Sequence, residues 1–158
     1  MNDDRNRQAT IGMHRDEAQV GASDEGMITV VSGSSVSDTI SGLEAAITSA
    51  GMQVFARIDH SGMAEAAGLE LRPTELLIFG NPRGGTPLMQ DQQTAAIDLP
   101  LKILIWEGAD GAVRVTYNDT AWLARRHGLG AGSDKAIATI TAALAALVAV
   151  VSRPGTQD

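Results

Sequence analysis

The fold is decided by residues 101–118, which read LKILIWEGADGAVRVTYN. The segment 101–107 is apolar on both faces of an extended chain, which is typical of a strand inside a sheet. Residues 112–118 alternate between apolar and polar side chains, as in a strand with one buried face. Asp110-Gly111 lies between the two segments and is a strong signal for a tight turn. The stretch therefore predicts a β-hairpin.

Outside the hairpin, the sequence predicts three more strands and two long helices. Segments that are β-branched, alternating or apolar predict strands at residues 27–32, 53–59 and 75–79. Apolar side chains at intervals of three and four predict helices at residues 36–50 and 134–152. Shorter helices are predicted at residues 63–67, 87–93 and 121–126. Thr86-Pro87 is expected to begin the second of these, with threonine as the cap and proline in the first turn.

The composition narrows the class of protein. The chain has 158 residues, about one domain, with 44% hydrophobic residues and a formal net charge of -7. A negative surface argues against binding to nucleic acid or to an anionic membrane, since proteins bind both through clustered lysine and arginine. The chain has no cysteine, which removes thiolate chemistry and is compatible with a reducing compartment. We therefore expect a soluble cytoplasmic protein without nucleic-acid or membrane partners.

The two ends of the chain differ from its middle. Residues 1–26 carry many charges and almost no large apolar side chains, so we expect a disordered acidic and polar tail. Residues 130–158 are interpreted as a linker followed by an alanine-rich helix. The apolar stretch of this helix, residues 142–151, is shorter than the roughly 20 residues that cross a bilayer. The helix would either pack on the sheet or join two monomers, and the sequence leaves both open.

Several runs of sequence resemble one known family, the bacterial and archaeal domain of unknown function 302. The resemblance covers residues 27–129 and rests on residues 55–61, 68–82, 85–89 and 99–102. It implies an α+β fold with a single, mainly antiparallel sheet of about five strands and helices packed on it. It also implies a homodimer. It implies no established activity and identifies no cofactor.

The first group of candidate site residues lies at the end of the strand 53–59, where Asp59 and His60 enter a glycine-containing loop. His60 could act as a general base, an anion contact or a metal ligand, or it could cap the loop. A metal site would need Asp59 or Glu65 as a second ligand. The three histidines show no metal-binding spacing, so no metal is expected and His60 is a weak candidate.

The second group brackets the strand 75–79. Arg72 could hold a carboxylate or phosphate through its planar guanidinium, or it could pair with an acidic residue nearby. The loop after the strand contributes four candidates: Asn81, Arg83, Gly85 and Thr86. Glycine-rich backbone after a strand can aim amide groups at an anion, although this loop lacks the lysine of a phosphate-binding loop. Turn geometry would explain the same residues.

Three hypotheses follow from these candidates. The leading one is a homodimeric module that binds a small molecule or anion in one pocket near His60, Arg72 and the loop 81–86. The second is an enzyme of unassigned reaction that uses His60 as a general acid or base. The third is a self-association or scaffold protein that uses the alanine-rich last helix.

Overall fold

The computed structural model describes residues 21–22 and 25–152. Most of the tail expected over residues 1–26 lies outside the described residues. The strands are β1 (Gly21–Ala22), β2 (Met27–Val31), β3 (Gln53–Asp59), β4 (Thr74–Gly80), β5 (Leu101–Glu107) and β6 (Val113–Asn118). The helices are α1 (Val36–Ser49), α2 (His60–Ala66), α3 (Pro82–Asp91), α4 (Thr120–His127) and α5 (Asp134–Val151), with short 3-10 turns at Gln93–Ile97 and Ala131–Ser133.

The strands form one sheet in the order β1-β2-β6-β5-β4-β3, and every neighbouring pair is antiparallel. The predicted α+β class with an antiparallel sheet is confirmed: five strands of five or more residues make up the sheet, and β1 adds a two-residue edge. The predicted hairpin is β5–β6, in which Glu107 pairs with Val113. Its turn has Gly111 at a φ of 76°, where a side chain would be strained.

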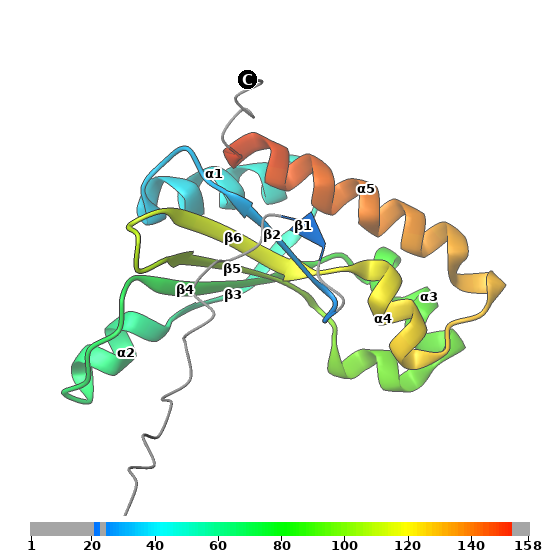
Figure 1. Cartoon of the computed structure of the whole chain (residues 1–158). Helices are drawn as coiled ribbons and strands as arrows, with labels where there is room; N and C mark the ends of the chain where they lie inside the picture. The colour runs from blue at the N-terminus through cyan, green and yellow to red at the C-terminus, as the bar shows by residue number, and fades with distance from the viewer. Residues whose placement is uncertain (1–20, 23–24, 153–158) are drawn as a thin grey trace, which may run out of the picture.

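One face of the sheet carries α1 and α5 (Figure 1). The core forms between this face and the two helices, because directly paired residues such as Leu77 and Ile103 project to the same side. Helix α1 contributes Ile40, Leu43 and Ile47, all fully buried. Helix α5 packs against α1 and α3 and contributes four core residues: Ile140, Leu144, Leu147 and Val148.

Helix α5 also has the length and composition of a membrane-spanning segment. In the part of the chain that the structure describes, it is the one helix that meets both criteria, and 28% of its apolar window is buried. Core helices of soluble proteins meet the same criteria, and four side chains of α5 lie in this core. The helix therefore carries no membrane assignment.

Among the described residues, no helix lies over the opposite face of the sheet (Figure 1). The register places half-buried apolar side chains of three neighbouring strands there, because Ile58 pairs with Leu76 and Leu76 pairs with Leu104. Trp106 lies on the same face, where it pairs with Arg114 and its ring lies 5.4 Å from the guanidinium carbon. We call this surface the open face.

Local capping signals explain where several helices begin. Helix α1 begins after Ser35, whose hydroxyl accepts from the amide of Asp38 at 3.1 Å. Helix α4 begins after Asp119 in the same way. Helix α2 begins at His60, three residues before the predicted start, because the carboxylate of Asp59 accepts from the amide of Gly62 at 2.8 Å and caps an earlier turn.

Candidate functional site

A cavity of about 590 Å³ lies at the end of the sheet where β4 runs into α3. This volume is within the range of small-molecule sites in proteins. Its walls come from the end of α1, from β3 and β4, from α3, from the segment before β5 and from α5. Most of the larger side chains in these walls are apolar: Met52, Phe55, Met89, Leu99, Leu101 and Ile140.

Phe55 is the most unusual of these wall residues. It lies at an irregularity in β3, between Val54 and Ala56, where the register with β4 shifts. Its ring is close to the end of β4, since a Cβ atom at Gly80 would be 3.7 Å from its Cε2 atom. Phe55 is 46% exposed, so a large aromatic surface is available to a molecule in the cavity.

Polar groups enter the cavity lining from α3 and α5. They belong to Asn81, Arg83, Thr86 and Thr139. Arg83 is the one charged residue in the lining that the structure describes. Within the described residues its guanidinium has no hydrogen-bond or ion-pair partner, in contrast to Arg57, which pairs with Glu75 at 2.6 Å.

The charges around the cavity favour an anion. Arg83 supplies the positive charge at the lining. The nearby carboxylates are already engaged. Asp91 accepts from the amide of Gly130 and from the hydroxyl of Ser133 at 2.8 and 2.6 Å, and Ser133 holds the pKa of this carboxyl below its usual value.

The second engaged carboxylate belongs to Asp98, which joins the segment before β5 to α4. It contacts the imidazole of His127 at 2.5 Å and the guanidinium of Arg126 at 3.4 Å. The His127 side chain is only 6% exposed. This pair could not be predicted from the sequence, because the two residues are far apart in the chain. The contacts fix one wall of the cavity.

The lining loop is itself the start of α3, which corrects the predicted helix at residues 87–93. Asn81 caps the helix by accepting from the amide of Arg83 at 2.9 Å, and Pro82 occupies the first turn. Thr86 and Pro87 lie inside the helix. Asn81-Pro82 therefore begins the helix five residues earlier than Thr86-Pro87 would. The helix contains two weak helix formers, Gly84 and Gly85, and the burial of Leu88 packs it against the core.

The same helix start removes the backbone anion site that the glycines suggested. The amides of Gly84 and Gly85 both donate to the carbonyl of Asn81, at 2.9 and 3.2 Å. The amide of Arg83 is satisfied by the Asn81 side chain. Any anion in the cavity would therefore depend on the Arg83 side chain and not on free backbone amides.

The remaining candidates lie at the other end of the sheet. Asp59 pairs with Glu75 at the beginning of β4, whereas the lining loop follows the end of β4. Seven strand residues separate the two groups, a distance of about 20 Å. The expected single pocket that joins His60 and Arg72 to the loop 81–86 does not form, because one strand connects the two groups end to end.

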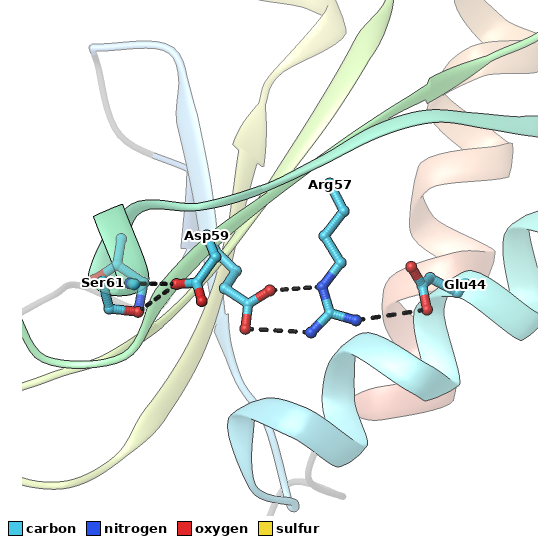
Figure 2. A network of polar contacts seen from close by, with 7 residues as sticks. Glu44, Arg57, Asp59 and Ser61 are labelled. Carbon is cyan, nitrogen blue, oxygen red and sulfur yellow. Dashed lines mark hydrogen bonds and ion pairs between the residues drawn. The ribbon is translucent and has the colours of Figure 1, made fainter. Parts of the chain in front are cut away.

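Figure 2 shows the polar network at this second end. Arg57 joins β3 to Glu75 at 2.6 Å and reaches Glu44 of α1 at 4.0 Å. Asp59 accepts from Gly62 and from the hydroxyl of Ser61, and these bonds hold the pKa of its carboxyl below the usual value. The network fastens edge strand β3 to its neighbours and caps α2, which is a structural role.

Arg72 and His60 do not complete a catalytic group here. The Arg72 side chain donates from Nε to the carbonyl of Glu107 at 3.1 Å and forms no ion pair with an acidic residue in the described ranges. It lines a shallow hollow together with Asp59 and Glu65. His60 is half-buried, lines neither the cavity nor the hollow, and has no side-chain hydrogen bond within the described residues. No group of three potential metal ligands occurs in the described part of the chain.

The apolar walls of the cavity were not predicted from the sequence, because they come from six separate segments of the chain. One signal was present. Phe55 occupies the same phase of its strand as Arg57 and Asp59, which are polar and exposed. An aromatic residue in a solvent-facing phase indicates a surface that something else can cover.

Comparison with known proteins gives one family. The family model described as "Domain of unknown function DUF302" matches residues 28–147, which includes most of α5. A crystal structure of an uncharacterised conserved DUF302 protein from Bacillus stearothermophilus has the same fold. Its TM-score is 0.71 and its identity 20%, over 79% of this chain and 97% of that one.

Curated relatives are more similar in sequence but much longer. "Fluoride-specific ion channel FluC 1" of Brucella suis biovar 1 (strain 1330) is 51% identical over 125 residues, which are 79% of this chain and 49% of the relative. "Fluoride-specific ion channel FluC 2" of Brucella melitensis biotype 1 (strain ATCC 23456 / CCUG 17765 / NCTC 10094 / 16M) is also 51% identical, over 46% of its length. The chain thus spans about half the length of these relatives.

Proposed function

The chain belongs to the DUF302 family, and on that premise we propose that it is a small-molecule-binding module whose site is the cavity between α3, α5 and the end of β4. One observation carries the proposal: an apolar cavity of about 590 Å³ into which a half-exposed phenylalanine, Phe55, opens. Apolar surface of this kind gains free energy when a ligand removes it from water. No comparable observation favours catalysis, because His60 has no side-chain hydrogen-bond partner within the described residues and lies outside the cavity.

A matched pair of alanine substitutions on α5 tests this site. Ala143 lines the cavity, whereas Ala146 is exposed on the same helix and does not line it. The neutral fluorescent probe N-phenyl-1-naphthylamine should bind the wild type and the Ala146→Phe variant. It should bind the Ala143→Phe variant much more weakly, because the phenyl ring would occupy the cavity. Equal binding by both variants would place the probe elsewhere and contradict the proposal.

We also propose that the module is a homodimer and that the open face is its interface. The support is the row of half-buried apolar residues, among them Leu76, Leu104 and Trp106, that no helix covers in Figure 1. A two-fold axis would bring two such surfaces together, since a dimer of this kind buries the same patch twice. The lack of cysteine supports a cytoplasmic location for it.

The mass in solution distinguishes this interface from the alanine-rich helix. Light scattering on size-exclusion fractions should give a dimer for the wild type. It should give a monomer for Leu104→Glu, because a charge would replace an apolar contact in the open face. Val150→Glu should remain dimeric, because Val150 lies on α5, outside the open face, and is 63% exposed. The opposite pattern would move the interface to α5, and a wild-type monomer at the same concentration would refute the dimer.

The sequence relatives favour a second candidate role, in association with a membrane channel. About half of each relative named as a fluoride-specific ion channel resembles this chain. We infer that the module acts beside such a channel and does not itself bind fluoride, because an apolar cavity cannot replace the hydration of a small anion. Deletion of the gene should then make its host more sensitive to fluoride. Unchanged growth in sodium fluoride would count against this role.

A further inference from the structure

We propose that the ligand of the cavity is an amphipathic acid, with one anionic head that pairs with Arg83 and an apolar body that lies against Phe55, Met89 and Ile140. This inference rests on the proposed binding function and adds the chemical class of the ligand. It follows from the distribution of charge and apolar surface in the cavity lining.

The walls exclude most polar ligands. A sugar or a nucleotide would bring many hydroxyl or phosphate groups, each of which needs a hydrogen-bond partner when it leaves water. Besides Arg83, the described lining offers polar side chains only on Asn81, Thr86 and Thr139. Two of these are engaged in their own helices, since Asn81 caps α3 and the Thr139 hydroxyl donates to the carbonyl of Lys135 at 2.9 Å.

The positive charge of Arg83 makes the cavity selective for a ligand with an anionic head. Its guanidinium has no acidic partner among the described residues, and its planar fork can donate two parallel hydrogen bonds to a carboxylate. The two carboxylates near the cavity, Asp91 and Asp98, are held by partners of their own. A single carboxylate head would therefore meet attraction without a competing acid.

A free inorganic anion fits less well than an amphipathic acid. Such an ion would contact Arg83 but would leave the apolar walls wet. A neutral apolar molecule would fill the walls but would leave Arg83 without an anion. Only a molecule with both parts uses the whole lining, because the cationic side chain lies on α3 and the apolar side chains lie on β3, α3 and α5.

The test compares two probes that differ in charge, decanoate and 1-decanol, by displacement of N-phenyl-1-naphthylamine at pH 7.5. The wild type should bind decanoate about tenfold more tightly than decanol, which is the effect of one partly exposed charged hydrogen bond. The Arg83→Gln variant should lose this preference and keep its affinity for decanol. Arg125→Gln is the matched control, because Arg125 is an exposed arginine on α4 that does not line the cavity.

The outcomes separate the two proposals. If the Arg83→Gln variant keeps the full preference for decanoate, or if the wild type has none, the assignment of an acidic head is wrong while the binding module stands. If Arg125→Gln loses the preference as Arg83→Gln does, the effect is one of net charge and the assignment of the head to Arg83 is overturned. If neither the fluorescent probe nor the two decyl compounds bind the wild type, the binding function itself is refuted.

Discussion

The substitution Phe55→Ala measures how much of the ligand affinity comes from the apolar wall of the cavity. Phe55 is 46% exposed in the unliganded protein. A buried aromatic side chain removes 150–250 Å² from water, so complete coverage of the exposed part by a ligand would bury roughly 90 Å². At about 25 cal/mol per Å², this burial is worth about 2 kcal/mol, and half coverage is worth about 1 kcal/mol.

These free energies correspond to a loss of affinity of roughly 5-fold to 30-fold in the Phe55→Ala variant. The assay is displacement of N-phenyl-1-naphthylamine by decanoate, with the dissociation constants of the variant and the wild type measured side by side. The melting temperature should change little in comparison, because the ring is half-exposed before the ligand binds.

Leu71→Ala is the matched control for this experiment. Leu71 is an exposed apolar side chain, 50% accessible, that lines the shallow hollow at the other end of the sheet. Its removal should leave the dissociation constant unchanged. If Leu71→Ala weakened binding and Phe55→Ala did not, the ligand would lie in the hollow near Arg72, and the reasoning from the cavity would be refuted.

Two further predictions concern the framework of the cavity. Leu144→Ala should lower the free energy of unfolding by about 2–5 kcal/mol in urea denaturation, because Leu144 is 3% exposed in the core; a change below about 1 kcal/mol would mean that α5 does not pack in the monomer. Asp91→Asn should destabilise the protein at pH 7, because the folded state lowers the pKa of the Asp91 carboxyl. The stabilisation from such an aspartate is present above its unfolded pKa and is lost as the pH falls through its folded pKa. The difference in unfolding free energy between wild type and variant should therefore shrink as the pH falls below about 4. A difference that stayed constant down to pH 2.5 would show that the carboxylate charge contributes nothing.

The elements that the sequence predicted best are those whose signals are local. The β5–β6 hairpin was predicted because its turn and both strand patterns lie within residues 101–118. The start of α1 is also determined locally, because the Ser35 hydroxyl accepts from the amide of Asp38, three residues along the chain. In both cases the contacts that define the element lie within a short stretch of the chain, so the local order of residues was informative.

The α3 region was misread because a local signal competed with a tertiary one. Gly84-Gly85 has a low helix propensity, and Thr86-Pro87 resembles the beginning of a helix. The burial of Leu88 and the cap at Asn81 outweigh both signals and extend the helix back to Pro82. The packing of Leu88 on the core, and the stabilisation that this packing gives, cannot be predicted from the neighbouring residues in the sequence.

Four of the seven candidate residues lie together in the structure, although they were chosen for a different reason. Asn81, Arg83, Gly85 and Thr86 do line the cavity, but they were chosen as a loop with free amides, and those of Arg83, Gly84 and Gly85 are already bonded. Asp59, His60 and Arg72 were grouped with them because all of these polar residues lie at the ends of strands, where a sheet can leave a crevice. A strand is extended, so residues at its two ends lie far apart. The group at the beginning of β4 and the group after its end are therefore separated by about 20 Å.

The alanine-rich composition of α5 has a consequence besides the two kinds of packing that the sequence left open. Small side chains let two helices approach closely, which is why a helix-helix seam was considered. Ala143, however, lines the cavity beside Ile140, one turn along from the core residue Leu147. A small residue at this position leaves room that a leucine or phenylalanine would fill. The same helix thus closes the core with its large residues and keeps the cavity open with a small one, so Ala143→Phe should remove the probe site without the loss of stability that Leu144→Ala causes.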